Sequence, residues 1–516
     1  MFNPKVYLVG SGPGDPGLLS VKAKELLQNA DILVYDFLVS SQILDLVRED
    51  AELVYVGKKG FSKHISQEEI NEILLELAKE NPEAIIVRLK GGDPYVFGRG
   101  SEEGLVLAKA GIPFELVPGI TSGMAALAYA GIPATHRNIS SSVAFITGHE
   151  DPSKEMSSIN WEHLAQGVDT LVFYMGVKNI ELIARNLLKY GRSPDEPVAL
   201  VRWGTNPQQE TLVSDLEHVA QEVQEKGFSA PSVICVGKVV NLRDDLNFFE
   251  SKPLHHKTIV VTRARSQASS MTRELCKLGA HVIEFPTIKI EFNDIAQELL
   301  DFISHRDEYS WLVLTSVNGV EALFQSLLVN GYDARVLSGI KVASIGSATA
   351  QALMDYGIVP DLIPEEYRAE SLVESLEEHN VAQGGKVLLV RASEARSLLI
   401  DELEKLGAST HVIDAYETVI DESVKLDELA EKLKANEIDL ISFTASSTVK
   451  NFMYLLEKKF TKEEVKEVLA KPCLASIGPI TSDTLRRYGF EPGLEAKEFT
   501  IPQLISQIED YYQNKQ

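Results

Sequence analysis

Residues 6–36, "VYLVGSGPGDPGLLSVKAKELLQNADILVYD", decide the fold of the first part of the chain. An apolar strand, a glycine-rich turn, a helix and a second apolar strand form a βαβ unit, in which ligands bind at the turn. Asp15 stands where a dinucleotide fingerprint has a small residue, and Pro13 lacks the N–H that a phosphate would need. The turn therefore suits a ligand without phosphate groups, although a tight turn in any doubly wound domain explains the glycines equally well.

Length and composition exclude several classes of protein. The 516 residues are too many for one core, so several domains are expected. No apolar run can span a bilayer and no secretory signal is visible, which predicts a cytoplasmic protein with no membrane partner. The net charge of -25 argues against nucleic acid as a partner. Three distant cysteines, Cys235, Cys276 and Cys473, predict neither a disulfide framework nor a metal site.

Apolar strands alternate with amphipathic helices along the chain, which predicts an α/β protein with sheets covered on both faces. The clearest strands of the first half are expected at 6–10, 32–36, 84–92, 170–176 and 198–204. The rhythm breaks at "RDDLNFFESKPLHHK", residues 243–257, a polar stretch that separates two halves. We expect the histidine pair in this stretch, His255 and His256, to be solvated.

The second half repeats itself at a spacing of about 130 residues, far above the period of solenoid repeats. Four matches occur in the same order: "VVTRA" at 260 with "LLVRA" at 388, "LCKLGAHVI" at 275 with "LEKLGASTHVI" at 403, "LVLTSVNGVEALF" at 312 with "LISFTASSTVKNF" at 440, and "SIGSATAQALMDYG" at 344 with "SIGPITSDTLRRYG" at 476. A duplicated domain predicts two lobes with a cleft for a ligand. The hydroxyl residues between its strands and helices either bind anions at helix N-termini or simply cap the helices.

A second glycine turn, "RLKGGDPYVFGRG" at 88–100, points to the cofactor of the first half. Two glycines at the end of a strand let a ligand approach the backbone, and Asp93 can accept hydrogen bonds or face a cation. Asp15 and Asp36 also follow strands, so this rim offers acid where a phosphate would need base. S-adenosylmethionine fits such a rim, because it carries a sulfonium cation and no phosphate.

The first half resembles the uroporphyrinogen-III C-methyltransferases over nearly all of residues 4–245. The resemblance rests on "GSGPGDPGLL", "VYDFLVS", "QEEIN", "VRLKGGDPYVFGRGSEE", "GIPFELVPGITS", "YAGIPATHR", "TLVFYMG", "RWGT" and "VGKVVNLRD". The second half resembles the uroporphyrinogen-III synthases through "TSVNGV", the "IG" turns and "AYETV". The two families catalyse consecutive steps, so their fusion in one chain makes metabolic sense.

The resemblance implies a particular domain organisation. A two-subdomain tetrapyrrole-methylase fold would occupy residues 1–245, divided near residue 118, and form a homodimer. A linker at 246–256 would lead to a two-lobed, internally duplicated synthase fold at 257–516. One lobe would combine 257–288 with 418–516, and 289–417 would form the other.

The resemblance also assigns roles to individual residues. Asp36 would accept a proton, Lys58 would donate one, and Tyr416 would help a hydroxyl group to leave. Read without the family, these are a strand-end carboxylate, a surface lysine and a core tyrosine. The S-adenosylmethionine site would comprise Pro13, Gly91, Gly92, Asp93, Val96, Thr121, Ser122, Met175 and Gly204. The substrate-binding residues would be Arg99 and Arg137 in the first half and Arg263, Thr315, Ser316, Ser347, Thr444, Ser446 and Thr481 in the second.

The expected function is therefore that of a bifunctional enzyme acting on small-molecule tetrapyrroles. It would cyclise hydroxymethylbilane to uroporphyrinogen III and methylate this product twice to precorrin-2, for sirohaem or cobalamin synthesis. An alternative is a methyltransferase of the same fold whose duplicated half is a bilobed sensor of small anions. No dehydrogenase or chelatase module is visible in the sequence.

Overall fold

The chain was analysed as a computed structural model that describes residues 5–48, 50–57, 65–148, 159–263, 265–366, 368–381, 386–395, 397–422 and 424–514. Two compact units are present. Unit 1 comprises Met1–Ile259, Arg273–Val282 and Ile505–Gln516, and unit 2 comprises Val260–Thr272 and Ile283–Leu504. None of the helices in these described residues has both the length and the apolar composition needed to cross a membrane.

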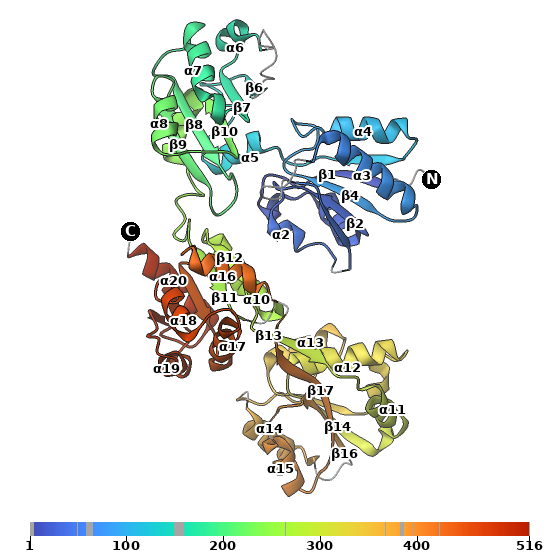
Figure 1. Ribbon diagram of the computed structural model, residues 1–516. Helices are drawn as coiled ribbons and strands as arrows, with labels where there is room; N and C mark the ends of the chain where they lie inside the picture. Colours follow the sequence, from blue (N-terminus) through green and yellow to red (C-terminus); the bar gives the residue numbers. More distant parts are fainter. Residues whose placement is uncertain are drawn as a thin grey trace. The chain divides into compact units, whose positions relative to one another are not determined.

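The first sheet of unit 1 is parallel and has the strand order β3-β2-β4-β1-β5 (Figure 1). Its strands are β1 (Val6–Gly10), β2 (Ile32–Tyr35), β3 (Glu52–Tyr55), β4 (Ile86–Lys90) and β5 (Phe114–Val117). Helices α1 (Val21–Asn29) and α2 (Ser41–Leu44) cover one face, and α3 (Gln67–Glu80) and α4 (Gly100–Lys109) cover the other. The order reverses between β1 and β4, and in doubly wound sheets ligands bind outside the carboxyl ends of the strands at such a point.

The second sheet of unit 1 is mixed and has the order β6-β7-β10-β8-β9. Its strands are β6 (Val143–Thr147), β7 (Thr170–Tyr174), β8 (Pro197–Arg202), β9 (Glu210–Asp215) and β10 (Ser232–Val236). Helix α5 (Ser122–Tyr129) packs on one face, and α6 (Trp161–Gly167), α7 (Ile180–Lys189) and α8 (Val219–Glu225) pack on the other. The five strands expected from the sequence are confirmed as β1, β2, β4, β7 and β8. The antiparallel pairing of β10 with β7 and β8 is not visible in the alternation of strands and helices.

The segment after the short helix α9 (Arg243–Leu246) is a packed part of unit 1. Glu250 accepts hydrogen bonds from Gln209 Nε2 at 2.8 Å and from Arg243 Nη2 at 2.6 Å. His255 is only 9% exposed, and its Nε2 donates to the Gln209 carbonyl oxygen at 2.9 Å. The expectation of a solvated histidine pair is therefore wrong for His255, because the folded first half buries it, whereas His256 is exposed.

Burial of His255 predicts a loss of stability in acid. Desolvation, followed by the neighbouring His256, lowers the pKa of His255 in the folded state. Its contribution to stability is therefore complete above the unfolded pKa of about 6.5 and is lost as the pH falls from there toward the folded pKa. His255→Gln keeps a donor for Gln209 and does not titrate. We expect it to reduce the fall in Tm between about pH 7.5 and pH 5.5 by roughly 2–4 °C, measured by differential scanning calorimetry. His163→Gln, an exposed control, should leave that fall in place, and an equal effect of both variants would contradict the prediction.

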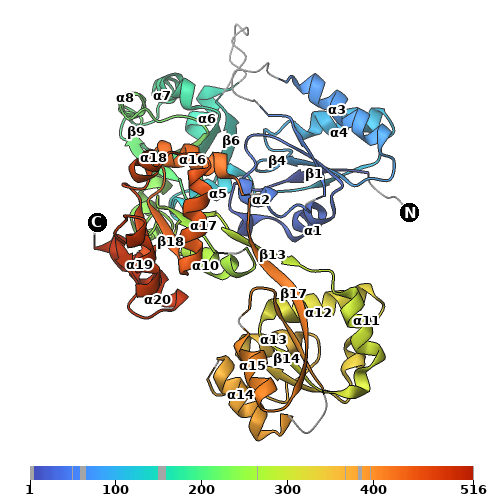
Figure 2. The ribbon, with the colours of Figure 1, turned by 60° about the horizontal axis from the view of Figure 1, so that its bottom comes forward.

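The second half of the chain forms two further sheets, each of five strands. The third sheet has the order β12-β11-β18-β19-β20, with β11 (Thr258–Val261), β12 (His281–Glu284), β18 (Leu440–Phe443), β19 (Cys473–Ser476) and β20 (Leu494–Glu495). The fourth has the order β13-β17-β16-β14-β15, with β13 (Ile288–Phe292), β14 (Tyr309–Leu314), β15 (Lys341–Ser344), β16 (Lys386–Ala392) and β17 (Ser409–Ile420), the long strand in Figure 2.

Helices separate most of these strands in the chain. They are α10 (Arg265–Lys277), α11 (Ala296–Ser304), α12 (Val317–Val329), α13 (Ser347–Asp355), α14 (Ala369–Glu378), α15 (Leu398–Lys405), α16 (Leu426–Lys434), α17 (Ser446–Glu457), α18 (Lys462–Val468), α19 (Pro479–Arg487) and α20 (Ile501–Gln513). In the fourth sheet α11, α12 and α13 cover one face and α14 and α15 the other. Helices α16 to α19 cover one face of the third sheet.

The two sheets place the repeated sequences at equivalent positions. The strands that carry the repeats are β12-β11-β18-β19 in one sheet and β17-β16-β14-β15 in the other, in the same spatial order. Even the register agrees, because Ala343 pairs with Leu362 and Ala475 pairs with Leu494, in parallel and at the same sequence separation. This correspondence is what a duplicated domain predicts. Each sheet takes two of these strands from the first repeat and two from the second.

Candidate functional site

Three loops at the carboxyl ends of β1, β4 and β5 meet through their backbones. Gly12 N donates to Gly92 O at 3.2 Å and Gly92 N donates to Gly12 O at 2.7 Å, which joins the first two loops. A Cβ added to Gly119 would lie 2.2 Å from the Gly92 oxygen, and one added to Gly10 would lie 2.5 Å from the Gly119 nitrogen. Only glycine permits this approach, so backbone atoms line the switch point of the sheet. We refer to Gly10, Gly92 and Gly119 as the glycine junction.

The residues predicted to bind the cofactor lie on the loops around this junction. Pro13 follows β1; Gly91, Gly92, Asp93 and Val96 follow β4; Thr121 and Ser122 begin α5; Met175 follows β7 and Gly204 follows β8. Thr121 Oγ1 lies 2.7 Å from the Tyr174 hydroxyl, which ties α5 to the end of β7. A Cβ added to Gly204 would lie 2.3 Å from Ala126 Cβ, so this glycine lets the loop press against α5. Their contacts with a cofactor stay predictions.

The acidic side chains at this rim hold the loops together. Asp15 Oδ1 accepts from Gly17 N at 2.7 Å, and its Oδ2 accepts from the Tyr129 hydroxyl at 2.7 Å. Burial and the neighbouring carboxylate raise the pKa of Tyr129, which keeps its hydroxyl a donor. Asp93 Oδ2 accepts from Gly119 N at 3.1 Å. These carboxylates have hydrogen-bond partners in the protein, so they stabilise the loops in addition to making the rim acidic, and their contact with a cofactor stays a prediction.

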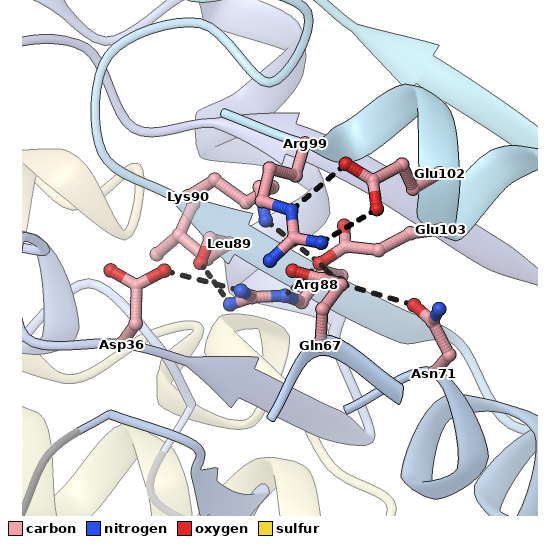
Figure 3. A network of polar contacts seen from close by, with 9 residues as sticks. All are labelled: Asp36, Gln67, Asn71, Arg88, Leu89, Lys90, Arg99, Glu102 and Glu103. Carbon is pink, nitrogen blue, oxygen red and sulfur yellow. Dashed lines mark hydrogen bonds and ion pairs between the residues drawn. The ribbon is translucent and has the colours of Figure 1, made fainter. Parts of the chain in front are cut away.

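The Asp36 side chain closes a backbone turn and is also partly exposed at the rim of the sheet. It lies directly after β2, and 25% of its side chain is exposed. Oδ1 accepts from Leu38 N at 3.2 Å, as a carboxylate that closes a turn would do. Oδ2 accepts from Arg88 Nη2 at 3.2 Å, and Arg88 itself is 2% exposed (Figure 3). Lys58, the predicted proton donor, lies outside the described residues.

Apolar side chains are exposed next to Asp36. Phe37 is 60% exposed and Leu38 is 53% exposed, and the Phe37 ring centroid lies 6.0 Å from that of Trp203. Met175 is exposed and has a φ of 56°, a backbone conformation that is unusual for this residue type and is concentrated at functional sites. Exposed apolar surface beside a carboxylate suits a ligand with flat, apolar rings.

The two arginines predicted to bind substrate in this half are both exposed. Arg99 Nε and Nη2 donate to the two carboxylate oxygens of Glu102, each at 2.8 Å. The hydrogen bond from Arg99 lowers the pKa of Glu102, but an exposed pair of this kind contributes little to stability. Arg137 lies in the turn joined by the bridge between His136 and Ser140. Both side chains are placed where a ligand could reach them.

A cavity of about 430 Å³ lies in unit 2 among the ends of strands and helices. Its lining residues are Arg263, Ile288, Thr444, Ala445, Ser447, Thr448, Ile477, Phe499, Thr500 and Ile501. Three of these segments lead into the N-termini of α17, α19 and α20. Helix N-termini carry partial positive charge and unpaired N–H groups, and Arg263 adds a guanidinium whose pKa is lowered by burial. The cavity is therefore built to receive anionic groups.

The structure brings together only part of the second-half residues predicted to bind substrate. Arg263 and Thr444 line the cavity, whereas Ser446 does not and its neighbour Ser447 does. Thr481 is 3% exposed, within the first turn of α19, and is not among the lining residues. A role for Thr481 or Ser446 in binding stays a prediction.

Tyr416 and the other predicted residues lie on the fourth sheet. Tyr416 is 7% exposed, and its hydroxyl donates to Ser316 Oγ at 2.9 Å. Ser316 Oγ in turn accepts from Gly319 N at 3.0 Å, so it caps α12. Thr315 precedes this cap, and Ser347 is an exposed first residue of α13. The geometry joins Tyr416 to Ser316, and a catalytic role for Tyr416 stays a prediction.

Sequence reasoning missed the part of the cavity that comes from residues 499–501. Thr500 precedes α20, whose second residue is Pro502, and threonine before a helix with proline in its first turn is a recognisable helix start. That signal predicts the helix, but it does not predict which distant residues lie beside the start of the helix. The cavity unites Arg263 with Thr500, more than 200 residues later in the chain, and no local pattern encodes that meeting.

Comparison with known proteins identifies the family. Residues 5–220 match the Tetrapyrrole (Corrin/Porphyrin) Methylases, and residues 269–506 match Uroporphyrinogen-III synthase HemD. The porphyrin biosynthesis protein HemD of Ruminiclostridium josui is 36% identical over 507 residues, which cover 98% of this chain and 97% of that protein. This chain belongs to the same family as that porphyrin biosynthesis protein HemD. It joins a methylase half to a HemD synthase half.

The methylase half also has relatives that match it alone. The methylase half is 52% identical to the S-adenosyl-L-methionine-dependent uroporphyrinogen III methyltransferase of Methanosarcina barkeri, over 47% of this chain and 94% of that protein. The crystal structure of uroporphyrin-III C-methyl transferase from Thermus thermophilus, complexed with S-adenyl homocysteine, is 42% identical and covers 46% of this chain and 99% of its own, with a TM-score of 0.40.

Proposed function

We propose that the chain is a bifunctional enzyme that makes uroporphyrinogen III and then methylates it. The HemD half cyclises hydroxymethylbilane, and the methylase half, acting as a homodimer, transfers two methyl groups from S-adenosylmethionine to give precorrin-2, a precursor of sirohaem or cobalamin. The observation that carries the methylase part is the partly exposed Asp36 carboxylate, oriented from both sides, next to the glycine junction. The similarity to the S-adenosyl-L-methionine-dependent uroporphyrinogen III methyltransferase of Methanosarcina barkeri supports the same assignment.

The residues around the junction fit a methyl donor without phosphate groups. Backbone N–H and C=O groups of the three loops suit the amino, carboxyl and hydroxyl groups of S-adenosylmethionine. A Cβ at Gly92 would lie 3.7 Å from Ser122 N and 3.8 Å from Thr121 Cα, so this loop lies beside the start of α5, where two of the predicted cofactor-binding residues are. Pro13 removes one donor that a phosphate would need.

The methylase half has two tasks in the reaction. When bound, the cofactor supplies an electrophilic methyl group and leaves as a neutral thioether. The pyrrole carbon attacks with its own π electrons, so the protein mainly aligns the two reactants, an effect worth about 7–11 kcal/mol. The methylated carbon already carries a side chain and has no hydrogen to lose, so the positive charge left by methyl addition is neutralised by loss of a proton from a pyrrole N–H or a bridging CH2 group. Asp36 then accepts this proton, and the electron pair of the broken bond stays in the macrocycle. Leu38 N and Arg88 hold the carboxylate in place for this step.

The main task of the synthase half is to control the conformation of hydroxymethylbilane, rather than to accelerate its cyclisation. Hydroxymethylbilane loses water and cyclises to the wrong isomer without help, so the enzyme has to hold the chain with its last pyrrole inverted. Arg263 and the helix N-termini at the cavity would bind substrate carboxylates, each charge-assisted bond contributing about 1.5–3 kcal/mol. The Tyr416 hydroxyl would assist loss of water.

One mixture tests both halves of the full chain. Hydroxymethylbilane alone should give isomer III, and adding S-adenosylmethionine should give a dimethylated product, both resolved by chromatography. Arg263→Met should shift the cyclised product toward isomer I while methylation of supplied uroporphyrinogen III continues. Isomer I as the sole product of the wild type would overturn the synthase assignment. Isomer III without any methylated product would overturn the methylase assignment.

A further inference from the structure

A buried cluster of charges lies behind Asp36 (Figure 3). Arg88 and Lys90 occupy the same face of β4 and are 2% and 5% exposed. Glu103 on α4 is fully buried and accepts from both of them, from Arg88 Nε at 3.2 Å and from Lys90 Nζ at 2.7 Å. Burying ionised groups is costly unless each has a close partner of opposite charge. Two cations thus share one buried carboxylate, and the second negative charge is that of Asp36.

Arg88 connects the buried carboxylate to the exposed one. Its Nε binds Glu103, its Nη1 donates to the Leu89 carbonyl oxygen at 3.0 Å, and its Nη2 donates to Asp36 Oδ2. These three bonds hold the planar guanidinium in one orientation. An arginine used in this way is pre-organised, so little conformational freedom remains to be lost when it binds a carboxylate. The direction of the Asp36 carboxylate therefore depends on a side chain that no ligand can touch.

The contacts of Glu103 are concentrated on one oxygen. Oε1 accepts from both cations and from Gln67 Nε2 at 3.3 Å, whereas Oε2 has no partner among the described residues. Lys90 and Glu103 alone form a neutral buried pair at 2.7 Å. An apolar residue at position 88 would leave this pair intact, so the pair does not need Arg88 for its own charge balance. Arg88 brings a further buried charge, and the feature it serves beyond the pair is Asp36.

We propose that Arg88 is a positioning residue for methyl transfer, which holds the Asp36 carboxylate aimed into the site while Glu103 fixes Arg88 from behind. This inference rests on the proposed methyltransferase function. The titratable groups that face Asp36 from the described neighbouring strands are Arg88 and Lys90 on β4 and Tyr55 on β3. Arg88 donates a hydrogen bond to the carboxylate at 3.2 Å, so its removal should act on the proton transfer.

Arg88→Met and Lys90→Met in the full chain form a matched pair of variants. Each removes one cation from Glu103, on the same face of the same strand, but only the first removes a bond to Asp36. We expect Arg88→Met to lower kcat for methyl transfer by roughly 10- to 100-fold, the loss expected for a charged hydrogen bond. Its KM for S-adenosylmethionine should stay close to the wild-type value. This split between kcat and KM separates lost positioning of the proton acceptor from lost cofactor binding.

Lys90→Met should lower the Tm comparably and leave kcat near that of the wild type. In the Asp36→Asn background, Arg88→Met should cause no further loss of kcat, because its effect passes through Asp36. Equal losses of kcat in the two single variants, or a full additional loss in the double variant, would overturn the proposal. If Arg88→Met does not fold, Arg88→Lys decides: it keeps the charge but lacks the planar set of donors that binds Glu103 and Asp36 together, so a reduced kcat is expected, and wild-type kcat would overturn the proposal. A wild-type chain without methyl transfer would instead refute the proposed function itself.

Discussion

Asp36→Asn is expected to reduce kcat for methyl transfer by about 10²–10⁴-fold, the contribution of a well-placed general base. Asparagine has nearly the same size and keeps an oxygen that can accept from Leu38 N, but it cannot take up the proton. The variant should fold, because Arg88 retains its buried partner Glu103. The rate is measured as methyl groups transferred from labelled S-adenosylmethionine to supplied uroporphyrinogen III.

Asp31→Asn is the matched control for this variant. Asp31 precedes β2, whereas Asp36 follows it, and each carboxylate binds one backbone N–H and one arginine: for Asp31, Ile85 N at 2.7 Å and Arg48 at 3.0 Å. Loss of the negative charge is the same in both variants, but Asp31 is at the end of the strand opposite to the glycine junction. We therefore expect its rate to remain near that of the wild type. A nearly unchanged rate in Asp36→Asn would remove Asp36 from the role of proton acceptor.

The local pattern of residues was sufficient to predict the strands and the glycine turns. Apolar runs that end in glycine predicted β1 and β4, and the structure brings their turns together at Gly12 and Gly92. The sequence repeats likewise predicted a duplication, and the equivalent strand orders agree with it. The hydrogen-bond partner of Asp15 was not predicted. Its carboxylate accepts from Tyr129, which lies more than 100 residues away, where no local pattern reveals it.

The buried charges of Arg88, Lys90 and Glu103 are a second feature that the local sequence pattern could not predict. "RLK" within a strand is typical of a face in contact with water, because arginine and lysine alternate with leucine. Here α3 and α4 cover that face, and Glu103, 15 positions after Arg88, supplies the compensating charge. Sequence alternation placed Arg88 and Lys90 on one side of β4 but could not say that this side is buried. Partners of this kind are set by the packing of whole elements, so the candidate positioning residue emerged only from the structure.

Gly119→Ala is expected to disrupt the methylase site through backbone contact alone. The added Cβ would lie 2.2 Å from the Gly92 oxygen and 2.8 Å from the Gly10 Cα, and neither is a flexible side chain that could move away. The loops after β1, β4 and β5 must therefore separate, which also strains the bond from Gly119 N to Asp93 Oδ2. Overpacking of this kind costs about 1–3 kcal/mol of stability.

The larger effect of Gly119→Ala should be on the reaction, because a displacement of about 1 Å in a positioned site can cost on the order of 10²-fold in rate. We expect calorimetry to show weak or absent binding of S-adenosylhomocysteine, together with a lower Tm. Gly167→Ala is the control: it lies at the end of α6, a Cβ there meets no atom within 4 Å, and alanine favours a helix. That variant should bind as the wild type does and be equally or more stable. Wild-type affinity in Gly119→Ala would mean that the junction of the three loops is not the cofactor site, because no ligand held by those backbones could tolerate their separation.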